Sequence, residues 1–527
     1  MPQQGGHIAI VGGGTAGWLA ALVLKNGYEQ QALRNSAHTV PKISVVESPN
    51  IPTVGVGEGS TSIFRQVLLD LGIDEAEFLK ETGATFKFGI HHKGWRKDRG
   101  DYYGPIDDPN QLFPAPSGAK GSWIHTARIA SQKPVEDIHL FTHLMRGQKS
   151  PYMMSKTGKM VHISQFHYAY HFDQAKLGKY LARKAVGVEH ILAEVSGLER
   201  NSETGDVTAL KLLDAEPLNV DFVIDCTGFR REIISELGGK WHSYGDFLPL
   251  NRAMPFWLDH DPEQDIPSCT LAHAQSSGWM WGIPTRDRMG CGYVYSGSHI
   301  TDDQAQREIE TTLGHKIEPR GVLTIDPGRQ EKAWISNCVS IGLSQSFLEP
   351  LEATSIHGSL VQLILLSQTK ASNLTRGAYG LARELYNDTV AGQVDDFAQF
   401  INLHYAGGRE DSPFWREMTE KGITRSVRER LSVWANEPVN RGHFPNFPAN
   451  LPHVEEQLHL PVLAGLGILP RGPSKAEMDA FPKVRAHARK TLLRAVPEFK
   501  SAASKAMGHR AYLDWVHAGS KITGITL

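Results

Sequence analysis

Hydrophobic residues near the start of the chain come in short runs separated by glycine or polar residues. The run Ile8-Ala-Ile-Val11 is long enough for one buried strand and leads directly into a glycine-rich turn at residues 12–17. Residues 18–24 are apolar and rich in helix formers. A second apolar run, 43–46, ends in Glu47. The pattern predicts a strand, a tight turn, a helix and a second strand, with polar residues 26–42 as an insertion before the second strand.

The same patterning over the rest of the chain predicts strands first and mostly helices later. Continuous or alternating apolar runs predict strands, whereas a period near 3.6 residues with capping residues predicts helices. The expected strands are 83–90, 188–195, 209–213, 220–228, 278–284, 290–296 and 334–343. The expected helices are 62–71, 173–185, 301–313, 356–366, 377–399, 413–420, 425–435 and 475–495. Residues 48–60, 100–135 and 436–452 are expected to be loops, the first of them close to a ligand.

These elements indicate an α/β protein with α+β features. A chain of 527 residues is too long for one small core. We expect a Rossmann-like module at 1–358 and a mostly helical module at 359–527 that covers the substrate site. We expect no internal repeat.

The glycine-rich turn has the spacing G-x-G-x-x-G at Gly12, Gly14 and Gly17. Glycines at this spacing allow a tight turn, a close approach of backbone N–H groups to a pyrophosphate, and packing of the helix on the strand. The helix N-terminus then faces the anion. Glu47, at the end of the second strand, is placed to bind ribose hydroxyls. An ordinary βα turn is the alternative, and the flanking strands make dinucleotide binding the favoured interpretation.

Charge and cysteine content narrow the class of protein. The chain has 55 basic and 57 acidic residues, a formal net charge of −2, so nothing in its overall charge points to nucleic acid or to an anionic membrane. No run of about 18 apolar residues is present, and we expect no secretory signal. The four cysteines lack C-x-x-C spacing, which favours a reducing compartment and therefore the cytoplasm.

Two groups of ionisable residues have a structural and a functional interpretation. His167, His171 and Asp173 suggest a metal site, but no further ligand cluster supports it, so we expect structural histidines and no metal. Lys87 lies between two phenylalanines in an expected strand. It is either an edge-strand charge facing water or a functional ammonium from which its neighbours exclude water. The segment by itself favours the first.

Several motifs, in order over residues 8 to about 430, resemble those of flavin-dependent halogenases of the tryptophan-halogenase type. The two main ones are the glycine turn and Trp279-x-Trp281-x-Ile-Pro284. The supporting segments are Ile51-Pro-Thr-Val-Gly-Val-Gly-Glu58, Phe86-Lys87, Asp225-Cys-Thr-Gly-Phe229, Asn337-Cys-Val-Ser-Ile-Gly-Leu343 and Phe347-Leu-Glu-Pro-Leu-Glu-Ala-Thr354.

The resemblance implies a reaction in two places. Reduced FAD, supplied by a separate flavin reductase, reacts with O₂ to give a flavin C4a-hydroperoxide, which halide attacks to form hypohalous acid. The acid passes through a tunnel to an electron-rich aromatic substrate, where Lys87 holds it or is halogenated by it and Glu352 assists. The implied cofactor-binding residues are Gly12, Gly13, Gly14, Thr15, Ala16, Gly17, Glu47, Val195 and Leu343. Thr354 and Ser355 are implied at the halide, and Trp279 and Trp281 between flavin and substrate.

These roles are chemically reasonable, although Glu352 has a second interpretation. A lysine ammonium can donate a hydrogen bond to hypohalous acid, and a carboxylate can accept the proton that the arene loses. An acid at a helix N-terminus is also stabilised by the helix dipole without any catalytic role.

The sequence departs from the family pattern at two places. The usual Pro-Leu-Glu-Ser-Thr-Gly is Pro-Leu-Glu-Ala-Thr-Ser here, so Ser355 adds a side chain beside the halide, and we expect bromide to be used better than chloride. No tryptophan-clasping aromatic cluster is recognisable at 436–452, so we expect small indoles to be preferred to free tryptophan. A single-component aromatic hydroxylase and a non-catalytic flavin-binding protein are the alternatives. The sequence leaves a homodimer open.

Overall fold

The computed structural model describes residues 6–35, 38–51, 57–119, 121–163, 166–448 and 451–519. The glycine turn belongs to a six-stranded sheet with the order β10-β2-β1-β14-β23-β22. Its strands are Glu189–Leu192 (β10), Lys42–Glu47 (β2), His7–Val11 (β1), Phe222–Asp225 (β14), Cys338–Ser340 (β23) and Trp334–Ile335 (β22). All neighbours pair in parallel except β22 with β23. Central strands buried on both faces explain the continuous apolar runs at 8–11 and 222–224.

Helix α1 (Thr15–Arg34) follows β1 as predicted but is longer than expected. Residues 26–34, predicted as part of a polar insertion, continue the helix. The reason is packing against helix α9 (Thr354–Ser367). Tyr28 is buried, and the Gln31 side chain donates a hydrogen bond of 2.7 Å to the Ser367 carbonyl. The polar segment therefore has one buried face.

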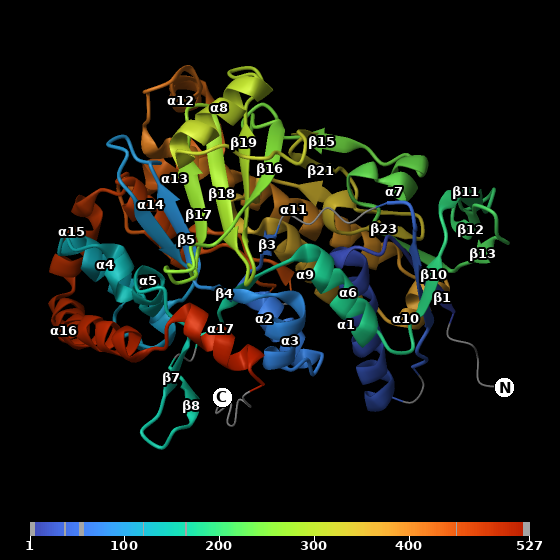
Figure 1. Ribbon diagram of the computed structural model, residues 1–527, viewed down its shortest axis with the longest axis horizontal. Helices are drawn as coiled ribbons and strands as arrows, with labels where there is room; N and C mark the ends of the chain where they lie inside the picture. Colours follow the sequence, from blue (N-terminus) through green and yellow to red (C-terminus); the bar gives the residue numbers. More distant parts are fainter. Residues whose placement is uncertain are drawn as a thin grey trace.

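A second, seven-stranded sheet has the order β20-β16-β19-β18-β17-β5-β6. Its strands are Leu323–Thr324 (β20), Arg252–Leu258 (β16), Met289–Tyr295 (β19), Gly278–Pro284 (β18), Thr270–Ala274 (β17), Gly89–Lys93 (β5) and Tyr102–Pro105 (β6). The predicted antiparallel pair at 278–284 and 290–296 is confirmed as β18 and β19. In Figure 1 this sheet stands between the six-stranded sheet and a group of helices at the other end of the molecule.

The predicted strand 83–90 is two strands in two different sheets. Strand β4 (Thr85–Lys87) pairs with β9 (Ala169–Phe172), which also pairs with β3 (Glu58–Gly59), whereas β5 starts at Gly89 in the seven-stranded sheet. A β-carbon at Gly89 would lie 2.3 Å from the Gly104 carbonyl oxygen, so the chain can change sheets here only with glycine. Lys87 is consequently the last residue of β4, at the junction of the two sheets.

Three other regions differ from the predicted elements. Residues 100–135, predicted as a loop, contain β6 and helix α4 (Trp123–Ala130), which buries Trp123 and Ile124. Strand β10 joins the main sheet, and a separate three-stranded sheet contains β11 (Val195–Arg200), β12 (Val207–Leu212) and β13 (Leu218–Asn219). The predicted strand 334–343 is two short antiparallel strands, β22 and β23, after which the chain turns into η4 (Gly342–Ser344).

The remaining predicted helices in the first 370 residues are confirmed. Helix α2 spans Ser62–Asp70, α6 spans Gln174–Lys184 and α8 spans Asp302–Leu313, whereas α3 (Glu75–Thr82) was not predicted. Asp173 caps α6 by accepting from the N–H groups of Ala175 and Lys176, and Thr301 and Gln304 form the expected capping box of α8.

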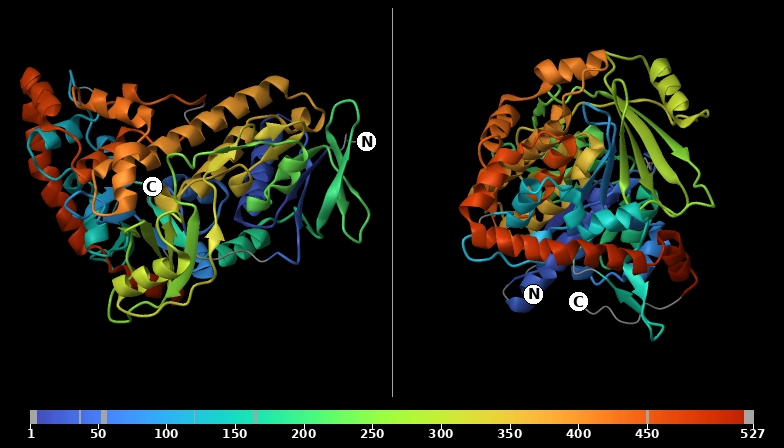
Figure 2. Two further views of the ribbon diagram at one scale, coloured as in Figure 1. Left: turned by 90° about the horizontal axis from the view of Figure 1, so that it is seen from above. Right: turned by 90° about the vertical axis from the view of Figure 1, so that its left-hand side faces the viewer.

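Beyond residue 370 most of the described chain is helical. The helices include α11 (Gly380–His404), α12 (Pro413–Glu417), α13 (Arg425–Trp434), α14 (Glu456–Leu466), α15 (Arg471–Ala480), α16 (Pro482–Lys505) and α17 (His509–His517). The predicted helix 475–495 is two helices, because Pro482 starts α16 as a first-turn proline. Figure 2 shows α11 extending from the helical end along the sheets, and α16 packs against α4 and α5 (Leu140–Arg146). The division at residue 358 stays a prediction. Within the described residues, no helix is long and apolar enough to cross a membrane.

Candidate active site

The turn between β1 and α1 has the geometry that its glycines predict. Gly12 has φ +118°, and a β-carbon there would lie 2.2 Å from the Cys226 carbonyl oxygen. A β-carbon at Gly17 would lie 1.9 Å from the Gly12 carbonyl oxygen, so helix and turn are in direct contact. At Gly14 a β-carbon would meet no atom within 4 Å. The turn is thus closely packed behind and open in front, as a backbone that approaches a ligand must be.

In front of this turn lies a cavity of about 570 Å³. The sequence-predicted residues that line it are Gly12, Gly13, Gly14, Thr15, Ala16, Glu47, Lys87, Val195, Trp281, Leu343, Thr354 and Ser355. Gly17, Trp279 and Glu352 lie outside the lining. Thr15, at the first turn of α1, has a buried hydroxyl with no hydrogen-bond partner among the described residues. These features fit the pyrophosphate of FAD. The open glycine turn and the helix N-terminus offer N–H groups to it, and the Thr15 hydroxyl has no other hydrogen-bond partner among the described residues.

Glu47 has the position predicted for a ribose-binding acid. It ends β2 and borders the cavity, and His190 Nε2 on the neighbouring strand β10 lies 2.8 Å from its Oε2. The His190 contact holds the carboxylate at the rim of the cavity. Val195, on β11, borders the cavity from the same side.

Lys87 also lines the cavity and is buried, with 3% of its surface exposed. The interpretation as an edge-strand charge facing water is therefore wrong. Its Nζ donates a hydrogen bond of 3.0 Å to the Ser60 carbonyl. Burial lowers the pKa of the ammonium to about 8, although the carboxylates of Glu352 and Glu58 act in the opposite direction. Lys87 is thus a lysine that can change protonation state near neutral pH.

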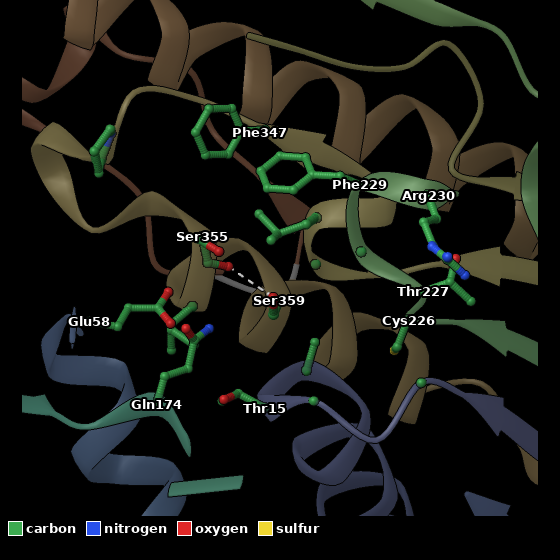
Figure 3. Close-up of a pocket in the computed structure, with 18 of the residues that line it drawn as sticks. Thr15, Glu58, Gln174, Cys226, Thr227, Phe229, Arg230, Phe347, Ser355 and Ser359 are labelled. Atoms are coloured by element: carbon green, nitrogen blue, oxygen red, sulfur yellow. Dashed lines mark hydrogen bonds between the residues drawn. The ribbon is translucent and has the colours of Figure 1, made fainter. Parts of the chain in front are cut away.

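Glu58, which the sequence did not single out, also borders the cavity beside Lys87. Its Oε2 is buried without a hydrogen-bond partner among the described residues. Burial raises the pKa of this carboxyl to about 7, while a hydrogen bond from Ser355 and the charge of Lys87 lower it. Figure 3 shows Glu58 and Ser355 on the same side of the cavity. The available signal was an acid at the end of the motif 51–58, of which residues 52–56 lie outside the described chain.

Thr354 and Ser355 begin helix α9. Ala353, just before them, has φ +55° and turns the chain into the helix. The first N–H groups of a helix have no partner within it and carry a partial positive charge. The Ser355 carbonyl accepts 2.8 Å from the Ser359 hydroxyl, drawn as the dashed line in Figure 3. The helix start therefore offers N–H donors to an anion in the cavity.

Glu352 lies just before α9, and its side chain is not part of the cavity lining. It belongs to η5 (Pro350–Glu352) and has 13% side-chain exposure. Its Oε1 lies 3.0 Å from Nε2 of His404, the last residue of α11, and 3.8 Å from Nε2 of His92 on β5. Lys87 and Glu352 interact electrostatically, although only Lys87 lines the cavity. The structure thus brings the two predicted catalytic groups together.

Trp279 and Trp281 lie in the same strand, β18, but in different surroundings. Trp281 borders the cavity, and its indole occupies space that a β-carbon at Gly292 would fill. Trp279 is fully buried and donates from Nε1 to Glu349 at 3.3 Å. Glu349 also accepts from the Tyr405 hydroxyl, and burial raises its pKa to about 7. Trp281 forms part of the cavity wall, and Trp279 packs behind it.

Other residues at the cavity and near it were not anticipated. Phe229 and Phe347 meet edge to face, with centroids 5.1 Å apart, and form one wall in Figure 3. His171 contacts the hydroxyls of Thr85 and Thr270, as expected of a structural histidine.

Residues 436–452, where no tryptophan-clasping aromatic cluster was recognised, contribute the buried side chain of Phe444 to a group of packed aromatic and histidine rings. Phe444 packs on His459, which also contacts Trp434 and Phe400. Phe400 in turn contacts His404, the neighbour of Glu352. These side chains fill space with one another, so they form a packed wall.

Comparison with known proteins gives a consistent result. A family model described as tryptophan halogenase matches residues 7–482. The chain is 30% identical over 504 residues to tryptophan 7-halogenase RebH of Lentzea aerocolonigenes, covering 89% of this chain and 90% of that protein. A tryptophan halogenase structure from Shewanella frigidimarina is similar, with a TM-score of 0.85, 27% identity and coverage of 97% and 98%. The structure of BrvH, a flavin-dependent halogenase from Brevundimonas sp. BAL3, has a TM-score of 0.81 and 29% sequence identity. The match covers 97% of this chain and 99% of BrvH.

Proposed function

Because the chain belongs to the tryptophan halogenase family, we propose that it halogenates a small aromatic substrate of the indole type at Lys87 and Glu352. The chain is a flavin-dependent halogenase, as its motifs predicted. The hydroxylase and the non-catalytic flavin-binding protein are therefore set aside. The observation that carries the proposed site is a buried lysine in the wall of the cavity that the dinucleotide-type turn also lines.

The glycine turn, Thr15, Glu47, Val195 and Leu343 are the residues that would hold FAD. When bound and reduced, FAD supplies with O₂ the oxidising power that turns halide into hypohalous acid. The turn and the start of α1 would face the pyrophosphate, and Glu47 the ribose. Trp281 would separate the flavin from the substrate side of the protein. We propose that the reduced flavin comes from a separate reductase, and we place the enzyme in the cytoplasm, which four free cysteines support.

We assign halide binding to the start of α9. The N–H groups of Thr354 and Ser355 would donate to the anion. Halide can bind here only when the neighbouring Glu58 side chain is protonated, because a Glu58 carboxylate would repel the anion. Burial raises the pKa of Glu58 to about 7, which keeps a large fraction protonated at neutral pH.

Lys87 and Glu352 would act at the substrate end. The Lys87 ammonium would donate a hydrogen bond to hypohalous acid and make its halogen more electrophilic, or the free amine would capture the halogen. Its lowered pKa of about 8 makes both forms accessible. Glu352, the main electrostatic partner of Lys87, would accept the proton released by the arene.

The decisive experiment measures brominated indole formed by the purified chain with FAD, a flavin reductase, NADH, bromide and indole. We expect product from the wild type and none from Lys87→Ala, with unchanged FAD affinity, because Lys87 belongs to β4 and not to the glycine turn proposed to hold the pyrophosphate. Lys483→Ala, on the exposed surface of α16, is the matched control. Retained bromination by Lys87→Ala would contradict the lysine assignment. Rapid NADH oxidation by the chain without the reductase would contradict the separate supply of reduced flavin.

A further inference from the structure

Three side-chain atoms that can bind a metal ion, two nitrogens and one oxygen, lie close together just before helix α9. They are Nε2 of His92 on β5, a carboxylate oxygen of Glu352 on η5, and Nε2 of His404 at the end of α11. One ligand atom from each residue lies within 4.8 Å of those of the other two. Both histidines are fully buried, while Glu352 keeps 13% side-chain exposure. Side chains from three distant parts of the chain thus form one group, and the partly exposed Glu352 side chain leaves it accessible to an ion from solvent.

The hydrogen bonding of His404 leaves a lone pair directed at Glu352. Its Nδ1 lies 2.9 Å from the Phe400 carbonyl, which can only accept, so Nδ1 carries the hydrogen. In the neutral ring Nε2 then has a lone pair, and it faces Glu352 Oε1 at 3.0 Å. Two lone pairs at this distance require a cation between them, either a proton or a metal ion. A backbone carbonyl that accepts from Nδ1–H is also the usual partner behind a metal-binding Nε2.

His92 supplies an independent indication of a missing ligand. Neither of its ring nitrogens has a hydrogen-bond partner among the described residues, although the side chain is completely buried. Such a polar group ordinarily has a partner. The ring stacks on Tyr102, with centroids 4.5 Å apart and planes at 6°, which fixes its orientation. Its Nε2 lies 3.8 Å from the same Oε1 that faces His404.

These separations suit a transition-metal ion. With metal–ligand bonds of about 2.0–2.2 Å in a tetrahedral site, neighbouring ligand atoms are about 3.3 Å apart. The observed distances of 3.0 Å and 3.8 Å lie on either side of this value. Two imidazoles and a carboxylate are the ligand set of open zinc sites, in which water takes the fourth position. Imidazole ligands disfavour Mg²⁺ and Ca²⁺.

We propose that His92, Glu352 and His404 form a binding site for a divalent transition-metal ion of the zinc class, and that the bound ion inhibits the enzyme. The ion takes the carboxylate oxygen that would otherwise accept the substrate proton, and it places positive charge near Lys87. The inhibition, unlike the binding, rests on the proposed function.

Isothermal titration calorimetry of the full chain, freed of metal with EDTA, tests the site with Zn²⁺ alone. We expect one site in the wild type and at least about tenfold weaker binding in His92→Phe, which loses a ligand but keeps a ring to stack on Tyr102. Glu352→Gln provides a second variant of unchanged size and should also weaken binding. His299→Gln is the control, because His299 lies 3.0 Å from Glu417 in a surface pair that could bind zinc adventitiously.

Bromination in the presence of Zn²⁺ tests the inhibition separately. We expect Zn²⁺ to stop the wild type, EDTA to restore it, and His92→Phe to need at least about tenfold more Zn²⁺ for the same inhibition. No zinc binding by the wild type, or equal affinity in wild type and His92→Phe, would overturn the site. Zinc that binds as expected without slowing bromination would overturn the inhibition. A wild type that brominates nothing even with EDTA would refute the proposed function, while the calorimetry would still decide the site.

Discussion

Lys87 and Glu58 are two ionisable side chains that the fold places in one low-dielectric corner. Burial disfavours the charged form of each, so it lowers the pKa of Lys87 to about 8 and raises that of Glu58 to about 7. Each also stabilises the charge of the other. Both groups therefore titrate close to neutral pH, where a small change in their surroundings alters the local charge.

At the residue scale, Glu352→Gln tests the proposed proton acceptor. The amide keeps the size of the side chain but cannot accept the arene proton, so turnover should fall by a factor on the order of 10² or more. The check is steady-state bromination of indole by wild type and variant in the presence of EDTA, which removes any metal effect. An unchanged rate would return Glu352 to the role of a helix-dipole acid before α9.

Glu58→Gln tests the raised pKa of Glu58 through stability. Between the ordinary pKa of 4.5 and about 7, folded Glu58 keeps a proton that the unfolded chain has lost. The free energy of unfolding of the wild type therefore falls as the pH rises through this window. The variant lacks this loss, so its stability relative to the wild type should rise by up to about 3 kcal/mol from about pH 4.5 to about pH 8.

Urea unfolding across this pH range measures the difference. Glu203→Gln, at an exposed site, is the control and should show little change with pH. A constant difference between Glu58→Gln and the wild type would contradict a raised pKa.

At the scale of elements, the start of α9 concentrates the halide chemistry in one helix turn. We expect the wild type to use bromide better than chloride, because bromide is easier to oxidise and costs less to desolvate. Ser355→Gly removes the side chain beside the proposed halide position and the hydrogen bond to Glu58. It should therefore raise the chloride-to-bromide product ratio in competition at equal concentrations. Ser367→Gly, at the last residue of α9 and outside the cavity lining, is the control. A chlorinated main product from the wild type would show that Ser355 does not restrict the site.

The whole molecule determines which substrates can reach Glu352. Among residues 436–448, Glu437 pairs with His443, and Arg441 pairs with Glu455 at 2.9 Å. These charged side chains already have partners, and an amino acid that buried its own ammonium and carboxylate unpaired would lose several kcal/mol. We expect indole to be brominated in preference to free tryptophan when both are present at equal concentration. Mass spectrometry of the products decides this, and bromotryptophan as the main product would contradict it.

Short segments of the sequence determined much of the site. The glycine spacing predicted the turn and its open front, and the strands around it followed from apolar runs. The motifs at 86–87, 279–284 and 347–354 identified the family. Such features depend on backbone geometry and side-chain periodicity over a few residues, so they are readable without the fold.

The tertiary structure decided what these residues face. Lys87 was predicted on its local pattern as an exposed edge charge, and only the change of sheet at Gly89 buries it beside Glu58. The two partners of Glu352 are distant from it in the sequence: His404 is 52 residues away, and His92 is much further away. They lie on elements that share no sequence pattern with it. The extension of α1 to Arg34 likewise depends on packing against α9. Burial, shifted pKa values and ligand convergence all arise from contacts between distant segments, and a local pattern carries no information about them.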